Sequence, residues 1–229
     1  MKMLGLIGGV SPESTVIYYR LLNDAARTHL GGEHSANTIL YALDYGVMIK
    51  HYTNKDWEAY AGEVARGAKH LKAAGVDALA IASNTSHIGA VAAGEATGLP
   101  VIHVMDALVD AMEAAGVKRP LLFGTPFVMA GSFYRPELST RFDGEALAPN
   151  ADEQDTIGRI ILDELVNGVV KDTSREELKQ IVANHDCDGV ILGCTELCMI
   201  LTQDDFDLPV FDTTGLHAAA VSAFAFEGV

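Results

Sequence analysis

The sequence is poor in aromatic residues, in cysteine and in positive charge. Aromatic residues make up 7% of the 229 positions, whereas alanine and glycine are plentiful, a composition that favours helices packed closely on a sheet. Lysine and arginine total 16 against 31 acidic residues, so the net charge is −15. Such a surface repels phosphate backbones, and we expect no nucleic-acid partner. An anionic small molecule can still bind at a locally basic site.

Cysteine and long apolar runs are equally scarce. Cys187, Cys194 and Cys198 are odd in number and form no disulfide framework, which fits a reducing compartment. No apolar run approaches the ~20 residues that span a bilayer. The apolar N-terminus is too short for a signal peptide. We therefore expect a cytoplasmic protein with no membrane partner. The histidines and cysteines also lack metal-ligand spacing, so no metal site is expected.

The apolar residues that are present form short runs between amphipathic stretches. With 49% hydrophobic residues the chain can bury a sizeable core. Short apolar runs that alternate with helical periodicity are typical of an α/β fold with parallel strands. We expect strands or strand-turns at 3–8, 38–43, 78–82, 99–102, 121–125, 189–192 and 208–211. Helices are expected at 11–29, 57–74, 106–115, 151–169, 174–184 and 213–224.

Three short motifs recur in the same order about 110 residues later. The apolar run that leads to Ser83 recurs before Cys194, 111 residues on. The motif 18–20 recurs at 133–135, and the motif 99–102 recurs at 208–211. The period is too long for a solenoid and suits two duplicated βαβ domains. We place the first domain at residues 1–102 plus 210–229, with the C-terminal helix returning to it, and the second at 103–209.

Four predicted loops collect at the carboxyl ends of the parallel strands, where open α/β sheets bind ligands. They are residues 9–11, 83–85, 125–126 and 194–196. Cys194 lies at a predicted helix start, where the helix dipole lowers the pKa of a thiol. Backbone N–H groups at such helix starts can hold a carboxylate. Ser83 and Cys194 facing one α-carbon would suit racemisation of an amino acid without a cofactor, one removing the proton and the other returning one.

Three motifs resemble the signatures of the aspartate/glutamate racemase family: Ile7–Thr15, Ser83–His87 and Leu192–Leu197. The resemblance covers essentially the whole chain. It implies two pseudo-symmetric, flavodoxin-like domains with the active site between them. It also implies a PLP-independent isomerase, usually a homodimer, that acts on a small acidic amino acid and needs no cofactor. Carried over by motif, Cys194 is one acid/base, and the substrate-binding residues are Val10, Ser11, Asn84, Thr85, Thr195 and Glu196.

The sequence departs from the family at Ser83, where the usual residue is cysteine. A serine hydroxyl is a poor base unless a neighbour activates it. His87, one helical turn later, either activates Ser83 or caps and packs the turn. Several readings stay open: an asymmetric natural racemase, an engineered serine, or a single-thiol decarboxylase or cis–trans isomerase of a small dicarboxylate. A ligand-binding protein of the same two-domain build is the rival from another class.

The residues that would bind the distal carboxylate of the substrate are less clearly indicated by the sequence. Tyr52 either reaches the distal carboxylate or is a surface aromatic. Lys50, Lys55 and Arg135 are the candidate cations. The sequence thus favours racemisation of aspartate or glutamate, with Cys194 as the competent acid/base and Ser83 as a weak second one.

Overall fold

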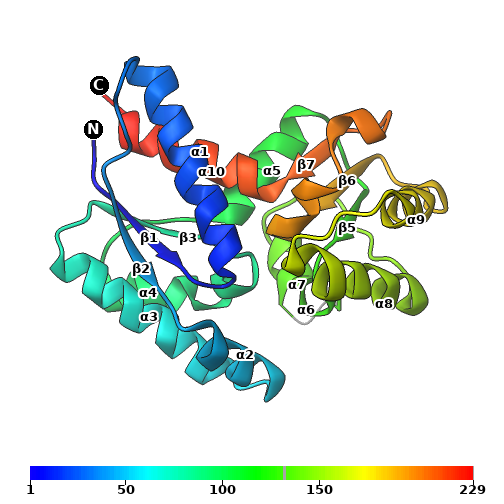
Figure 1. Ribbon diagram of the computed structural model, residues 1–229, viewed down its shortest axis with the longest axis horizontal. Helices are drawn as coiled ribbons and strands as arrows, with labels where there is room; N and C mark the ends of the chain where they lie inside the picture. The colour runs from blue at the N-terminus through cyan, green and yellow to red at the C-terminus, as the bar shows by residue number, and fades with distance from the viewer. Residues whose placement is uncertain (131–132, 229) are drawn as a thin grey trace. The chain divides into compact units, whose positions relative to one another are not determined.

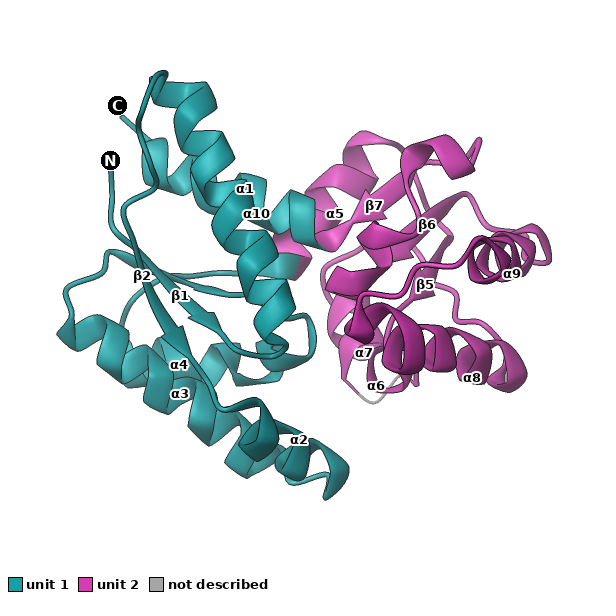
Figure 2. Ribbon diagram, in the orientation of Figure 1, with its two compact units in different colours: residues 1–104, 214–229 teal, residues 105–213 magenta. Residues whose placement is uncertain are grey.

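The computed structural model of the protein describes residues 1–130 and 133–228 and divides into two compact units (Figure 2). Unit 1 contains residues 1–104 and 214–229, and unit 2 contains residues 105–213. Each unit is built on its own parallel sheet. No helix among the described residues is long and apolar enough to cross a membrane.

Unit 1 contains a four-stranded parallel sheet in the order β2-β1-β3-β4. The strands are β1 (Leu4–Gly8), β2 (Thr38–Ala42), β3 (Ala78–Ile81) and β4 (Val101–Ile102). Every residue of β1 and β3 is buried. Strands that are covered on both faces read as continuous apolar runs, which is why the sequence predicted these two well.

Two helices cover each face of this sheet (Figure 1). On one face lie α1 (Pro12–Leu30) and α10 (Thr213–Phe226), where Tyr18 and Val221 pack against Leu6. On the other lie α3 (Trp57–Ala73) and α4 (Ala90–Thr97). A further α-helix of this unit, α2 (Tyr45–Thr53), follows β2. The return of the C-terminal helix to the first unit agrees with the prediction.

Unit 2 contains a three-stranded parallel sheet in the order β5-β6-β7. Its strands are β5 (Pro120–Phe123), β6 (Gly189–Leu192) and β7 (Val210–Asp212). Its described helices are α5 (Val104–Ala114), α6 (Pro126–Met129), α7 (Tyr134–Ser139), α8 (Ala151–Arg159) and α9 (Asp172–Ala183). One face of the sheet buries Phe123 and Leu192 against Ile157 of α8 and Leu178 of α9.

The strand order β1-β3-β4 of unit 1 is repeated as β5-β6-β7 in unit 2, and the two parallel sheets confirm the predicted α/β class. The middle strand of each of these trios, β3 or β6, is followed two residues later by Ser83 or Cys194. A five-residue 3-10 helix then follows, at Thr85–Gly89 in unit 1 and at Thr195–Met199 in unit 2. A last short parallel strand completes the pattern.

The boundaries between the units differ slightly from the predicted ones. Residues 210–213 were assigned to the first domain, but they belong to unit 2 because β7 is hydrogen-bonded to β6. His103 and Val104 were assigned to the second domain, but they belong to unit 1. There the Val104 N–H donates to His87 Nε2 at 3.2 Å. Both corrections follow from hydrogen bonds to distant residues, which local periodicity does not reveal.

The segment 151–169 was predicted as one helix and is instead broken into three pieces. Helix α8 is followed by a π-helical turn (Ile160–Glu164) and a 3-10 turn (Leu165–Asn167). Glu164 is buried, and its carboxylate accepts hydrogen bonds from Ser174 Oγ (2.6 Å) and from Arg159 (2.6 Å). Glu164 is the last residue of the π-helical turn.

Candidate active site

In unit 1 the predicted site residues lie at the carboxyl edge of the sheet. Ile7 of β1 is paired with Ile81 of β3, so the segments that follow these two strands leave the sheet side by side. Val10–Ser11 follows β1 and Ser83–Thr85 follows β3. The structure therefore brings together these predicted residues of the first half. Ser83 and Asn84 are buried, whereas Val10 and Thr85 are half-buried.

The loop after β1 is held by short polar contacts. Ser11 caps α1 by accepting a hydrogen bond from Ser14 N–H at 3.3 Å. Thr15 Oγ1 accepts from Gly9 N–H at 2.7 Å and donates to Ser11 O at 3.0 Å. Gly9 has a φ of +95°, and a Cβ there would lie 2.2 Å from Leu43 O, so only glycine fits. The loop that carries Val10 and Ser11 thus has a defined shape.

The geometry around Ser83 decides between the two roles considered for His87. His87 Nδ1 lies 2.8 Å from the carbonyl oxygen of Ser83, which can only accept a hydrogen bond, so Nδ1 carries the proton. Nε2 accepts from Val104 N–H, so it is unprotonated. Both nitrogens of a neutral ring are therefore engaged with the backbone. His87 does not activate the Ser83 hydroxyl, which itself accepts from Ser86 N–H at 3.3 Å.

In unit 2 the thiol of Cys194 lies at the corresponding edge of the second sheet. Phe123 is paired with Leu192, and Gly193 N–H donates to Phe123 O at 2.7 Å just before the cysteine. Cys194 is buried, and its Sγ–H donates to Glu196 Oε2 at 3.0 Å. The Thr195 hydroxyl donates to the same oxygen at 2.7 Å. Thr195 and Glu196 are themselves buried, so the three side chains form a compact polar group.

The predicted lowering of the Cys194 pKa is wrong. Burial, and then the negative charge of Glu196, raise the pKa of the thiol well above its usual value. The expected helix is only the short 3-10 helix Thr195–Met199, which supplies little dipole to oppose these effects. Burial and Glu196 therefore both favour the thiol form of Cys194 over the thiolate in the resting site.

Tyr52 lies on α2, in the segment that follows β2 of unit 1. Its half-buried ring meets the ring of Trp57 edge to face, with centroids 5.7 Å apart. Lys50 and Lys55, near the end of the same helix, are exposed. This packing gives Tyr52 a defined position, and its contact with a substrate stays a prediction.

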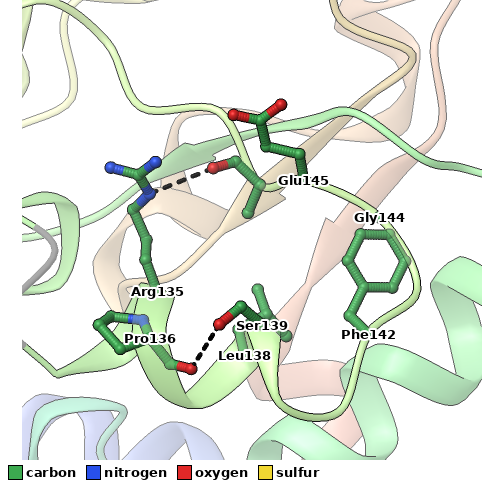
Figure 3. Close-up of a pocket in the computed structure, with 8 residues that line it drawn as sticks. Arg135, Pro136, Leu138, Ser139, Phe142, Gly144 and Glu145 are labelled. Atoms are coloured by element: carbon green, nitrogen blue, oxygen red, sulfur yellow. Dashed lines mark hydrogen bonds between the residues drawn. The ribbon is translucent and has the colours of Figure 1, made fainter.

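Arg135 belongs to the wall of a cavity of about 320 Å³ in unit 2 (Figure 3). The cavity is lined by Arg135, Pro136, Leu138, Ser139, Phe142, Gly144, Glu145 and Ala146. Arg135 Nε donates to Ala146 O at 3.1 Å. None of the predicted acid/base or substrate-binding residues lines this cavity. Across the described residues, no three His, Cys, Asp or Glu side chains are grouped to hold a metal ion.

Thr125 and Asp212 lie at the carboxyl edge of unit 2 and were not among the site residues predicted from the sequence. Thr125 follows β5, and its buried Oγ1 has no hydrogen-bond partner among the described residues. Asp212 ends β7 opposite Leu192. Burial, and then the charge of Asp212, raise the pKa of Cys198 to about 12. The available signal for Thr125 was its place in the strand-end loop 125–126.

A family profile for Asp/Glu/hydantoin racemases matches residues 7–221. The chain belongs to this family. Among curated proteins it is similar to the broad specificity amino-acid racemase RacX of Bacillus subtilis, at 21% identity over 97% of the chain and 98% of the relative. The predicted family resemblance is therefore confirmed.

Solved structures agree over almost the full length. A candidate Asp/Glu racemase from Yersinia pestis is 36% identical, with a TM-score of 0.92 over 98% of this chain and 99% of that one. An aspartate racemase homologue from Pyrococcus horikoshii OT3 is 30% identical, with a TM-score of 0.86 over the same shares. Relatives at this level identify the chain as an isomerase of the racemase family.

Proposed function

We propose that the protein racemises an acidic amino acid, aspartate or glutamate, by moving a proton at the α-carbon without PLP. The observation that carries this proposal is the buried Cys194 thiol, which is hydrogen-bonded to Glu196 at the ligand-binding edge of the sheet in a chain of the racemase family. An α-proton is weakly acidic, so its removal needs a positioned base. A thiol that can pass its proton to a neighbouring acceptor becomes a thiolate, which is such a base.

Glu196 is the nearest acceptor for the Cys194 proton. Its Oε2 already accepts the thiol hydrogen at 3.0 Å, so a transfer along this bond yields a thiolate and a neutral carboxylic acid. The transfer also removes the negative charge that raises the pKa of the thiol. The sequence assigned Glu196 to substrate binding, yet a carboxylate would repel the carboxylate groups of an acidic amino acid. We therefore give Glu196 the role of proton acceptor.

Ser83 supplies the second proton. A hydroxyl is a poor base but a competent acid toward a carbanion. In the proposed direction the Cys194 thiolate removes the α-proton of one enantiomer and the Ser83 hydroxyl protonates the opposite face. The resulting alkoxide then takes a proton from water, and Glu196 releases its own. Ser83 and Cys194 occupy matched positions, each two residues after the middle strand of the repeated trio in its own unit.

The remaining predicted residues would hold the substrate. Asn84, Thr85 and Thr195 offer amide, hydroxyl and backbone N–H groups for the α-carboxylate. Val10–Ser11 would line the pocket, and Tyr52 would reach the distal carboxylate. The buried, unpartnered hydroxyl of Thr125 adds a further candidate contact.

The test is incubation with the L and D forms of aspartate and glutamate in D2O. Mass spectrometry measures α-deuterium and chiral chromatography measures inversion. We expect deuterium uptake with inversion, faster from one enantiomer, and loss of both in C194A. C198S is the matched control and should retain activity. Absence of exchange with every acidic amino acid would contradict the proposed function.

A single-thiol decarboxylase of a small dicarboxylate is the alternative. It is favoured by one observation, that unit 1 presents a hydroxyl where unit 2 presents a thiol. Release of CO2 from substituted malonates, together with no α-exchange in aspartate or glutamate, would favour this reaction over racemisation.

A further inference from the structure

Three buried histidines form a cluster in unit 1. The ring of His87 meets the ring of His103 at a centroid distance of 4.6 Å and that of His217 at 5.3 Å. His103 follows β4, and His217 lies in the first turns of α10. The cluster therefore lies where the chain leaves unit 1 after Val104 and where it returns with α10.

Hydrogen bonds tie this cluster to the backbone. His217 Nε2 donates to Ile102 O at 2.8 Å, and Tyr18 OH donates to His217 Nδ1 at 2.8 Å. His87 Nδ1–H donates to Ser83 O, and His87 Nε2 accepts from Val104 N–H. One ring thus joins the Ser83 turn to the first residue of α5.

We propose that His87 is the positioning residue for the Ser83 hydroxyl. The turn after β3 is short. The orientation of the Ser83 backbone, including its carbonyl group, therefore fixes the direction of the Ser83 hydroxyl. His87 holds that peptide through its carbonyl and anchors it to Val104, a residue 21 positions later. This role rests on the proposed function, because it concerns the delivery of a proton by Ser83. A displacement of about 1 Å at a reacting group can cost ~100-fold in rate.

Two variants separate the two hydrogen bonds of the ring. In H87N the amide N–H takes the place of Nδ1–H and can still donate to Ser83 O, but nothing reaches Val104. In H87Q the amide oxygen takes the place of Nε2 and can still accept from Val104 N–H, but the donor to Ser83 is lost. The pair is matched in polarity, so a general loss of packing affects both.

The readout is the ratio of inversion to α-deuterium exchange with retained configuration. Exchange with retention needs Cys194, whereas inversion also needs Ser83. In H87Q we expect inversion to fall by ~10- to ~100-fold with exchange nearly unchanged, and in H87N we expect the wild-type ratio within about threefold. A wild-type ratio in H87Q, or an equal loss of both rates in both variants, overturns the positioning role.

A second measurement on the unmodified protein keeps the inference testable if the variants misfold. The ring nitrogen chemical shifts of His87 in 15N-labelled protein should show a protonated Nδ1 and an unprotonated Nε2 at neutral pH. The opposite tautomer, or a charged ring, would overturn the inference. Failure of the proposed function is distinct, because wild type would then show neither exchange nor inversion with any acidic amino acid.

Discussion

Cys194 immediately precedes the short 3-10 helix Thr195–Met199, and Glu196 lies two residues later within it, with its side chain hydrogen-bonded to the thiol. This proximity has two opposite effects. The carboxylate opposes the formation of a second negative charge beside it, so it favours the thiol. The same carboxylate is the group that can accept the thiol proton during catalysis. Substitutions at Glu196 should therefore have opposite effects on two quantities: they should favour the thiolate of Cys194 and slow the racemisation.

We expect E196Q to react faster with iodoacetamide at Cys194 and to racemise more slowly. Loss of the negative charge lowers the pKa of the thiol, so the alkylation profile moves to lower pH. Loss of the proton acceptor should reduce turnover by about 100-fold. Alkylation is followed by mass spectrometry, with C194A as the control for site specificity. Unchanged racemase activity in E196Q would remove Glu196 from the proton path.

Ser83 is the second residue whose chemistry can be tested alone. We expect S83C to raise the rate of the slower direction by about tenfold or more, because a thiol is a far better base than a hydroxyl. The matched variant S83A should lose inversion and retain α-exchange by Cys194. The rates are measured from each enantiomer separately. A decrease in S83C would mean that the surrounding turn is adapted to the hydroxyl.

At the scale of elements, the segment 151–169 carries a buried carboxylate, Glu164, in the π-helical turn that follows α8. Glu164 accepts hydrogen bonds from Ser174 of α9 and from Arg159, and Lys171 Nζ lies 3.3 Å from its Oε1. The hydrogen bond from Ser174 is the main cause that lowers the pKa of Glu164. The π-helical turn thereby joins α8 to α9 through side chains.

S174A should lower the free energy of unfolding by about 2 kcal/mol, the usual contribution of a buried hydrogen bond to a charged group. The folded-state pKa of Glu164 is depressed, so this stabilisation is present above the usual glutamate pKa and is lost as the pH falls through the folded value. Urea unfolding at pH 7 and at acidic pH measures both effects. S139A removes an exposed hydroxyl and should change stability by less than ~0.5 kcal/mol.

At the scale of the molecule, unit 1 is assembled from both ends of the chain. Lys2 N–H donates to Ala225 O at 2.9 Å, and Lys2 Nζ pairs with Glu227. Inside the unit, His217 of the last helix bonds Tyr18 of the first one. The fold of the first unit is therefore complete only after the last helix has been synthesised.

His217 should make the protein sensitive to mild acid. Burial lowers its pKa to about 4, against a usual value of 6.5. The neutral ring therefore stabilises the fold above pH 6.5, and this stability is lost as the pH falls through about 4, a change of about 3 kcal/mol. Urea unfolding between pH 7 and pH 4.5 should show a shallower pH dependence in H217Q. The exposed His34, replaced in the same way, is the control, and equal slopes in wild type and H217Q would contradict the prediction.

Local patterns in the sequence determined most of the scaffold. Buried parallel strands are continuous apolar runs, and Ser11 with Pro12 marks the start of α1, so these elements followed from neighbouring residues. The repeated motifs predicted that Ser83 and Cys194 each follow a buried strand, which are β3 and β6, and parallel strands bring such residues to the carboxyl edge of their sheet. The family also followed from these motifs.

Only the tertiary structure decided the protonation states of the buried side chains and the point at which the predicted helix 151–169 ends. The tautomer of His87 depends on Val104, and the buried carboxylate of Glu164 has its hydrogen-bond partner in Ser174 of α9. Cys194 has its acidic neighbour within two residues, but its pKa is raised first by burial, which the whole of unit 2 creates. Periodicity reports which face of an element is covered. The charge on a buried group depends on what covers it, and that is known only once the chain has folded.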